Sequence, residues 1–300
     1  MATSPGAVAG RNDQEIQANA AAALEQKRQR RYLVKALLRS PTFMAGLIIL
    51  LFWVFMGLFS TRFTQDPTAV NAMSVLKAPS AAHWFGTDDL GRDVFARTMA
   101  GAATVLVIAP VATILALFFG GVIGLVAGFY RGITDEIIMR LVDVLLALPV
   151  VITAILVLSL LGKAEIFVIL VIAALFTPIV SRTIRSAVLG EREREYVMAA
   201  RLRGERSPFV MSREILPNIT QPIIVEGTVR LGYAVFTAAT LSFLGFGLQP
   251  PSPDWGLTIA LERVFVQIAP WTVLFPAFAL ATLVVGVNLI TDGLSRVFSR

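Results

Sequence analysis

The chain has 300 residues, of which 56% are hydrophobic and only 15% are charged, so it carries more apolar surface than one water-soluble core can bury and is predicted to be an integral membrane protein. The net charge of +6 comes from basic residues beside hydrophobic runs, which favours contact with a membrane surface over nucleic-acid binding. Cysteine is absent and His83 is the only histidine, which excludes disulfides, thiol catalysis and cysteine or histidine metal clusters.

Residues 1–41 are predicted to be a cytoplasmic N-terminal tail. Its first ten residues are small, whereas Asn12 to Arg39 has the composition of a helix lying on the membrane surface, which Pro41 would end. No apolar stretch follows the basic cluster Lys27 to Arg31 until Pro41, and the next apolar run is long enough to stay in the bilayer. We therefore expect no cleavable signal peptide.

Six apolar runs are predicted to cross the bilayer, since a span needs about 20 helical residues. Five of them are clear, and the shorter sixth, Ile166 to Ser181, is needed to keep residues 182–218 on the same side as the tail. The expected layout is an all-α fold with a first span over 42–60, an outer loop over 61–101, a core of five spans over 102–292 and a C-terminus over 293–300. The other runs are Thr42 to Ser60, Ala102 to Tyr130, Val144 to Gly162, Leu231 to Pro253 and Val264 to Thr291.

Most Lys and Arg residues lie in the tail, in the turn from Arg131 to Arg140, in the loop 182–218 and at the C-terminus. Because basic residues favour the cytoplasmic side, both termini and the loop 182–218 are predicted to be cytoplasmic. Arg62 to Gly101 and Gln249 to Arg263 are then expected on the outer face.

Three acidic residues of the outer loop, Asp88, Asp89 and Asp93, are a possible calcium site, but the glycine and terminal glutamate of an EF-hand are not in register. We expect instead that they precede a short outer helix over Leu90 to Met99, whose positive N-terminal end they complement.

The predicted second span carries a stripe of small residues, Gly120, Gly121, Gly124 and Gly128, which favours close approach of another helix. Prolines in or beside the spans, Pro149 among them, are expected at kinks or boundaries.

Two intramembrane charge pairs are predicted from spacing. Glu226 and Arg230 are four residues apart on one helical face near the cytoplasmic end of the fifth span, and Asp143 follows Arg140 by three residues. Unpaired charges at this depth cost several kcal/mol, so we expect structural pairing, with contact to a substrate or gating as the alternative.

No intrinsic catalytic motif is recognised. The only Gly-Lys pair, Gly162-Lys163, has Val157 where a phosphate-binding loop needs glycine, and neither a zinc-protease nor a serine-hydrolase motif occurs. Any nucleotide that energises this protein must therefore be handled by another subunit.

The loop 182–218 is crowded with arginine and glutamate. A helix is predicted to end at Gly204, where glycine can take the left-handed conformation. Ser207 and Pro208 are expected to be the N-cap and first-turn proline of a second helix from Pro208 to Leu216, which Pro217 would stop. The corner between the two helices should expose Glu205, Arg206, Ser207, Pro208 and Phe209 to a partner.

This loop resembles the coupling motif of bacterial ABC importer permeases: Ala199-Ala200, then Gly204, then Glu214-Ile215-Leu216-Pro217 at the family's spacing. The chain departs from the motif at Met198, where the family usually has glutamate, and the role of that glutamate is not transferred. The resemblance implies that the ATPase-coupling residues are Ala199, Ala200, Gly204 to Phe209, Ile215, Leu216 and Pro217.

Two further segments resemble the C-type subunit of dipeptide and oligopeptide permeases: His83 to Asp93, and Leu241 to Pro251. Together the three motifs extend from the first outer loop to the last span. The resemblance implies a type I importer permease in a bacterial inner or plasma membrane, paired with a B-type permease, two cytoplasmic ATPase domains that bind ATP and Mg²⁺, and an extracytoplasmic peptide-binding protein. It places Gly86, Thr87, Asp88, Asp89, Gly91, Arg92 and Asp93 on the outer face, against the binding protein or over the pore mouth.

Other functions stay open at this point. An ion-coupled secondary transporter would need proton- or sodium-binding residues at the midplane, and only Asp143, Glu226 and Arg230 are available. A membrane scaffold would leave the coupling motif unexplained. Within the importer family, glutathione and nickel chelates are alternatives to peptides as the transported solute.

Overall fold

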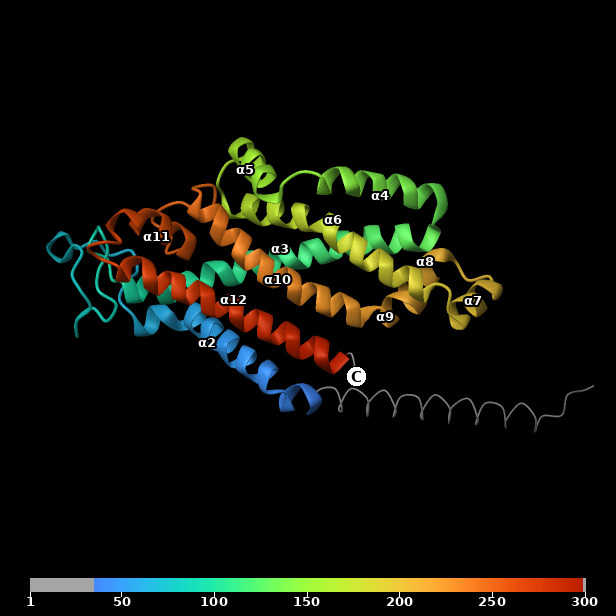
Figure 1. The fold of residues 1–300 in the computed structure, drawn as a ribbon, viewed down its shortest axis with the longest axis horizontal. Coiled ribbons are helices and arrows are strands. Elements are labelled where there is room, and N and C mark those ends of the chain that lie inside the picture. The colour runs from blue at the N-terminus through green and yellow to red at the C-terminus, as the bar shows by residue number, and fades with distance from the viewer. Residues whose placement is uncertain (1–34, 299–300) are drawn as a thin grey trace, which may run out of the picture.

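The computed structural model describes residues 35–298, and Figure 1 shows them as an elongated bundle of helices. Of the surface helix expected over Asn12 to Arg39, only the final turn lies within the described residues. Lys35 to Arg39 is helical, and Ser40 separates it from the first long helix.

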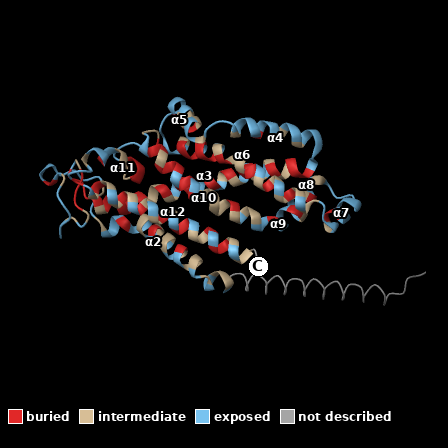
Figure 2. Cartoon of the chain, viewed as in Figure 1, coloured by how far each residue is buried: buried red, intermediate tan, exposed pale blue. Residues whose placement is uncertain are grey.

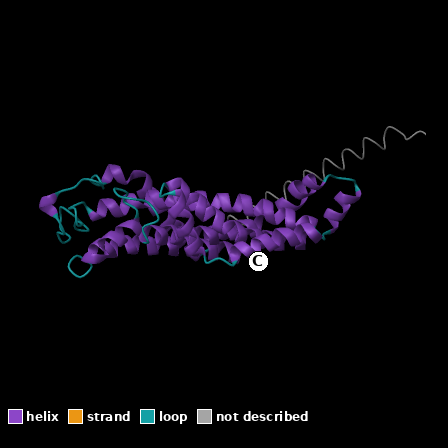
Figure 3. Cartoon of the chain, turned by 90° about the horizontal axis from the view of Figure 1, so that it is seen from above, coloured by secondary structure: helices purple, strands orange, loops and turns teal. Residues whose placement is uncertain are grey.

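The described residues contain helices and loops and no strand (Figure 3). Besides two short 3-10 turns, the elements in chain order are α2 (Pro41–Phe63), α3 (Val94–Tyr130), α4 (Gly132–Leu146), α5 (Val150–Leu161), α6 (Glu165–Glu191), α7 (Glu195–Leu202), α8 (Ser207–Phe209), the π-helix η2 (Val210–Ile215), α9 (Leu216–Asn218), α10 (Thr220–Phe243), α11 (Trp255–Glu262) and α12 (Trp271–Phe298).

The two ends of the bundle differ in their elements (Figure 1). The loop 64–93 and α11 lie at one end, which we call the α11 end, and the short helices α7 and α8 lie at the opposite end, the α7 end. The long helices α3 and α6 run side by side through the middle, and α2 pairs with α12.

Small residues set the close approach of these helices. A Cβ atom at Gly120, Gly124 or Gly128 would lie 2.5–2.8 Å from atoms of α6, so this part of the predicted stripe does bring α3 against α6. Gly121 has nothing within 4 Å and takes no part in the contact, because it lies on another side of the helix. Gly46 and Gly286 allow the same close contact between α2 and α12.

The buried residues lie in the interior of the bundle, whereas the outer faces of the long helices are exposed (Figure 2). Those outer faces carry large apolar side chains, among them Ile48, Phe118 and Leu160, which are 61%, 62% and 87% exposed. Continuous exposed apolar surface on helices whose backbone bonds are all internal is the arrangement required by a lipid bilayer.

Within residues 35–298, four helices are long and apolar enough to span a membrane: α2, α3, α6 and α12. The predicted third span, Val144 to Gly162, is not one continuous helix. It covers the end of α4 and the whole of α5, which meet at 85°, with Pro149 directly before α5, where its ring prevents the preceding residues from continuing a helix.

Three further boundaries differ from the sequence expectation. The outer helix expected over Leu90 to Met99 is instead the beginning of α3, which starts at Val94 and continues without a break. The helix expected over Leu231 to Pro253 runs from Thr220 to Phe243. It includes the polar turns before Leu231, in which Glu226 is buried and paired with Arg230, and it ends before a glycine- and proline-rich turn. The last helix begins at Trp271 rather than Val264.

Candidate functional site

The predicted corner in the loop 182–218 is built on a specific helix ending. Gly204 has φ +78°, the left-handed conformation expected at this position. The Gly204 amide donates to the carbonyl of Arg201 at 3.0 Å, and the Glu205 amide donates to that of Ala200 at 3.2 Å. These two bonds form the Schellman motif, which satisfies the last carbonyls of α7 and reverses the chain.

The chain after the corner is close to one continuous helical rod, unlike the short stopped helix expected from the sequence. Arg206, not Ser207, is the N-cap residue, and it makes no side-chain cap. Pro217 does not end the helix, because it occupies the first turn of α9, where a missing amide hydrogen is tolerated. Only Ile219 interrupts the path from α8 through η2 and α9 into α10.

The corner is anchored on one side and open on the other. Val210 and Ile215 are fully buried, whereas Glu205, Arg206 and Pro208 are exposed and Phe209 is 43% exposed. Leu202, in the last turn of α7, is 89% exposed and adds an apolar side chain that the motif did not indicate. The exposed tip thus presents apolar and charged groups together.

The base of the corner rests on the end of α3. The guanidinium of Arg201 lies over the Phe129 ring, 4.6 Å from its centroid, and Arg192 donates to the backbone carbonyls of Phe129 and Gly128. Ala200 of the motif is buried at this contact region, whereas Ala199 is exposed. This link between the loop and α3 was not predicted, because residues 129 and 201 are far apart in the sequence.

The predicted pair of Arg140 with Asp143 is wrong. Arg140 contacts Glu136 at 3.7 Å on its own helix, and Asp143 binds Arg182 of α6 instead. A second ion pair joins the same two helices, since Arg185 donates to both carboxylate oxygens of Asp135 at 2.5 and 2.6 Å. Both pairs fasten α4 to α6, and a local spacing rule could not reveal partners on another helix.

Glu226 and Arg230 do lie together, with Arg230 Nε 2.8 Å from Glu226 Oε1. Both side chains are largely buried, and the contact lacks the alignment of a hydrogen bond. The Arg230 guanidinium also lies 5.1 Å from the ring centroid of Tyr233 and 5.9 Å from that of Phe176 on α6. The pair therefore sits between α10 and α6, where it balances charge inside the bundle.

At the α11 end, the sequence motif around residues 86–93 folds inward. The buried Asp88 carboxylate accepts from the Arg92 side chain at 2.6 Å and from the backbone amides of Leu90 and Arg92. Arg97 Nε lies 3.6 Å from the same carboxylate. Gly91, at φ +73°, allows the turn, since a Cβ there would lie 1.9 Å from the carbonyl oxygen of Asn71.

The other members of this motif secure neighbouring segments. Asp93 caps α3 by accepting from the Ala96 amide at 2.7 Å, and it contacts His83 Nδ1 at 2.9 Å. The Thr87 hydroxyl accepts from the Lys77 amide, and Gly86 packs against Trp271 of α12. Thr87, Asp88, Arg92 and Asp93 are buried, so among the acidic residues of the motif only Asp89, 32% exposed, reaches the surface.

Glu262 of α11 joins this network, although the sequence did not single it out. Ligand oxygens of Asp88, Asp89 and Glu262 lie within 4.8 Å of one another, and Glu262 is 1% exposed. Burial, with the neighbouring carboxylates of Asp89 and Asp88, raises the pKa of Glu262 to about 8. Glu262 can therefore keep its proton at neutral pH and add no third negative charge. The negative charge of Asp88 is neutralised by Arg92 and Arg97.

Comparison with known proteins gives a consistent result. Residues 120–300 match the family model described as the binding-protein-dependent transport system inner membrane component. The dipeptide transport system permease protein of Alkalihalophilus pseudofirmus is 41% identical over 261 residues, which cover 87% of this chain and 86% of that protein. The oligopeptide transport system permease protein of Bacillus subtilis is 36% identical, with 84% and 83% of the two chains covered.

Two further similarities bear on substrate and fold. The glutathione transport system permease protein of Pectobacterium atrosepticum is 38% identical over 73% of this chain and 72% of its own length. A solved structure of the methionine ABC transporter MetNI in inward-facing conformations has a TM-score of 0.57 at 16% identity, covering 68% of this chain and 97% of the matched chain. At this identity the match supports the fold alone.

Proposed function

We propose that this chain, which belongs to the family of binding-protein-dependent transport system inner membrane components, forms half of the translocation path of an ATP-driven importer for dipeptides or oligopeptides. It is a membrane component without an enzymatic role of its own. The observation that carries the proposal is the corner at Gly204 to Phe209, exposed at its tip and continuous with α10 at its base.

The proposed topology has six spans. α10 is the fifth of them although it carries Glu226 and Arg230, because these charges pair inside the bundle and not against lipid. The bent pair of α4 and α5 is the third. The distribution of basic residues supports a cytoplasmic position for the α7 end and both termini, and an extracytoplasmic position for the α11 end.

The proposed partners follow from the family and the missing phosphate-binding loop. A B-type permease would complete the path, two cytoplasmic ATPase domains would bind ATP and Mg²⁺, and an extracytoplasmic binding protein would deliver the solute. Peptide is favoured as the solute because relatives from several bacteria are named as dipeptide, oligopeptide or peptide permeases. Glutathione, itself a tripeptide-like solute of one relative, is the alternative.

The proposed mechanism is mechanical. Closure of the ATPase domains displaces the exposed tip, and the rod from Ser207 onward carries the displacement into α10. The contact of Arg201 and Arg192 with the end of α3 provides a second route into the bundle. The two states differ in the contacts that the tip makes with the ATPase domains, which is the differential interaction that any population shift requires.

The experiment for the assembly is to purify the tagged chain from native membranes in mild detergent and to identify its partners by mass spectrometry. Two P-loop ATPase domains, a second permease and a binding protein are expected. A single-species preparation from cells that express those partners would contradict the proposal and favour a secondary transporter or a scaffold.

The experiment for the corner uses Gly204→Trp and Phe209→Asp. We expect both variants to insert and assemble but to hydrolyse ATP without peptide uptake, because the tip no longer fits its partner. Met73→Asp is the control for membrane insertion, assembly and basal ATP hydrolysis, since Met73 is 88% exposed at the end opposite the corner. Full uptake by the two corner variants would remove the coupling role from these residues.

A further inference from the structure

A pocket of about 370 Å³ lies between α10 and α12, and polar side chains from both helices line it. Tyr233 comes from α10, Asn288 and Asp292 come from α12, and all three are exposed. Asn288 and Asp292 are four residues apart, so they share one face of α12. Gly232 of α10 leaves room for the asparagine, since a Cβ there would lie 3.1 Å from Asn288 Oδ1.

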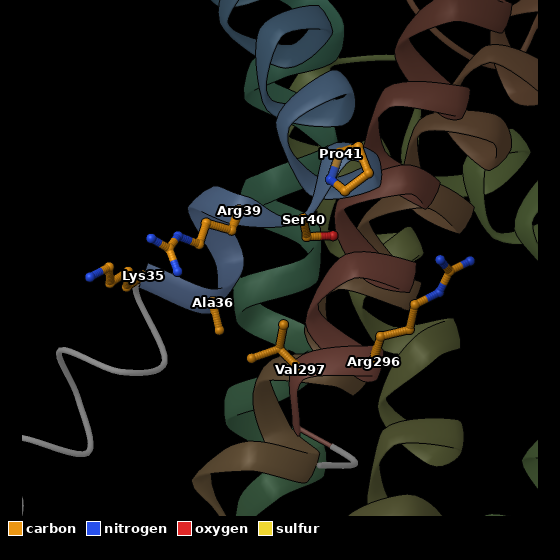
Figure 4. Close-up of a pocket in the computed structure, with 7 residues that line it drawn as sticks. All are labelled: Lys35, Ala36, Arg39, Ser40, Pro41, Arg296 and Val297. Atoms are coloured by element: carbon orange, nitrogen blue, oxygen red, sulfur yellow. The ribbon is translucent and has the colours of Figure 1, made fainter.

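Basic residues mark the level at which α2 and α12 leave the membrane. Lys35 and Arg39 precede Pro41, the first residue of α2, and Arg296 lies in the last turn of α12 (Figure 4). α2 has 23 residues, so it extends about 34 Å at 1.5 Å per residue, which matches a hydrocarbon layer of about 30 Å. The hydrocarbon layer therefore begins near Pro41.

The polar residues of the pocket lie deeper than this level. A Cβ at Gly46 of α2 would lie 2.8 Å from the amide nitrogen of Ile290 on α12, so these two residues are at the same depth. Gly46 follows Pro41 by about 8 Å along α2, at 1.5 Å per residue. Asp292 is two residues nearer the edge than Ile290, and Asn288 is two residues further in. Both side chains therefore start at the depth of the lipid chains, below the headgroups.

The polar ends of these two side chains are not satisfied within the described part of the chain. Neither Asn288 nor Asp292 has a side-chain hydrogen bond or an ion pair with another residue in the range 35–298. On α10, by contrast, Glu226 lies 2.8 Å from Arg230, so that pair adds no net charge. A lone carboxylate at this depth is costly against lipid and is expected to face water or a binding partner. The pocket is therefore expected to be a water-accessible site with negative charge.

We propose that Asp292, with Asn288 and Tyr233, is a subsite of the translocation path that binds a primary ammonium group, supplied by the amino terminus of the transported peptide. The inference rests on the proposed function and names the group of the solute that this chain recognises. An ammonium group has three donors, and the carboxylate, the amide oxygen and the hydroxyl would be its three acceptors. The pocket volume is within the range of about 300–1,000 Å³ that is common for ligand pockets.

A second source of the same group is the headgroup of phosphatidylethanolamine. Its phosphate would stay at the level of Pro41, whereas Asp292 and Asn288 are attached further inside the hydrocarbon layer. A peptide in an aqueous path is not held at the interface in this way. The peptide is therefore the proposed ligand.

The first experiment measures access to the pocket in the whole transporter, reconstituted in phosphatidylglycerol nanodiscs. The chain has no cysteine, so Val229→Cys places its single thiol in the pocket lining. A water-soluble maleimide should label this thiol. Phe118→Cys, on the exposed apolar face of α3, should resist labelling because lipid covers it. Millimolar alanyl-alanine should slow the labelling of Val229→Cys, whereas N-acetyl-alanyl-alanine, which has no ammonium group, should not.

Variants in the Val229→Cys background test the carboxylate. Asp292→Asn should raise the concentration of alanyl-alanine that gives half-protection by about tenfold, because a charge-assisted hydrogen bond is lost. Asp292→Glu keeps the charge and should keep the protection. Glu165→Gln removes the same charge from the exposed first turn of α6 and should leave the half-protection concentration unchanged. Equal half-protection concentrations with and without the Asp292→Asn substitution would overturn the proposal.

Two other occupants have distinct outcomes. Slow labelling of Val229→Cys without peptide, seen only in phosphatidylethanolamine nanodiscs, would assign the pocket to a lipid headgroup. Resistance to labelling in every nanodisc, with loss of the second permease from Asp292→Asn, would assign it to a subunit interface. Either result would overturn the proposal.

Uptake of alanyl-alanine separates this inference from the proposed function. The wild-type transporter should take up the dipeptide when ATP is supplied, and Asp292→Asn should lower that uptake while basal ATP hydrolysis stays unchanged. Full uptake by Asp292→Asn would remove the subsite and leave the importer intact. No uptake by wild type, in the presence of all its partners, would remove the proposed function and the subsite with it.

Discussion

Both ends of the bundle are rich in charged residues, but these residues are buried and paired at the α11 end and exposed at the α7 end. At the α11 end, Asp88, Arg92 and Arg97 are at most 5% exposed and are paired with each other or with backbone groups. At the α7 end, the corner residues Glu205 and Arg206 are exposed, and Arg203 reaches Glu214 only at 3.7 Å.

This difference teaches that a conspicuous charged motif does not by itself mark a binding surface. Buried charges must be paired, so the α11 network fixes the loop 64–93 against α3 and α11. Exposed charges contribute little to stability, so the α7 corner is available for a partner. Comparing the stability effects of substitutions at the two ends tests this difference between buried and exposed charges.

The largest effect is expected for Asp88→Ala, which leaves two buried guanidinium groups without their carboxylate. Breaking a buried pair in this way costs about 3–5 kcal/mol. Glu205→Ala removes the same charge from the exposed corner and should change stability little. Thermal unfolding of the detergent-solubilised proteins measures both, with Asp88→Asn as the variant that keeps an acceptor. Equal melting temperatures for Asp88→Ala and Glu205→Ala would contradict the contrast.

The second prediction compares the substitution of alanine for two glycines with positive φ, Gly204 and Gly91. Gly204→Ala should cost about 1–2 kcal/mol, the strain of a side chain in that conformation, because its Cβ meets nothing within 4 Å. Gly91→Ala bears the same strain and adds a backbone clash with Asn71. We therefore expect a clearly lower melting temperature for Gly91→Ala. The reverse order would show that the α11 end is less rigid than its contacts indicate.

A smaller effect concerns pH at the α11 end. The folded pKa of Glu262 is raised above its ordinary value near 4.3, so its protonated form stabilises the folded state at low pH. This contribution is fully present below about pH 4 and is lost as pH rises through about 8. The charged groups that interact with Glu262 are Asp88, Asp89, Arg92 and Arg97.

The measurement is the melting temperature of wild type and Glu262→Gln between pH 5 and pH 9. Wild type should lose stability toward pH 9, whereas the variant should have a flatter profile. Glu205→Gln, at the exposed corner, should keep the wild-type slope. A Glu262→Gln profile as steep as that of wild type would assign the slope to another group.

The smallest effect is expected where the corner meets α3. Arg201→Ala removes the contact with the Phe129 ring and should lower stability by about 0.5–1 kcal/mol, the usual contribution of an exposed cation–aromatic contact. Arg206→Ala, at the exposed tip, should be neutral in the same thermal unfolding assay. If both variants behave alike, the corner is not held by α3.

Several features follow from local sequence. Gly204 ends α7 in the left-handed conformation, Glu226 lies beside Arg230, and three of the four stripe glycines of α3 lie on one face, because each depends on residues within one or two helical turns. The limits of the helices were less predictable. Pro217 lies in the first turn of α9, where a missing amide hydrogen is tolerated, and α10 begins eleven residues before the apolar run does, since a helix can extend beyond its apolar residues.

The sequence by itself determined the membrane class, the exposed corner and the family motifs, since composition, turn residues and spacing are local properties. Only the tertiary structure decided that Asp143 pairs with Arg182, that Arg201 rests on Phe129 and that Glu262 joins Asp88. These partners are separated by 39 to 174 residues along the chain. Their meeting depends on how whole helices pack, which no short-range pattern encodes.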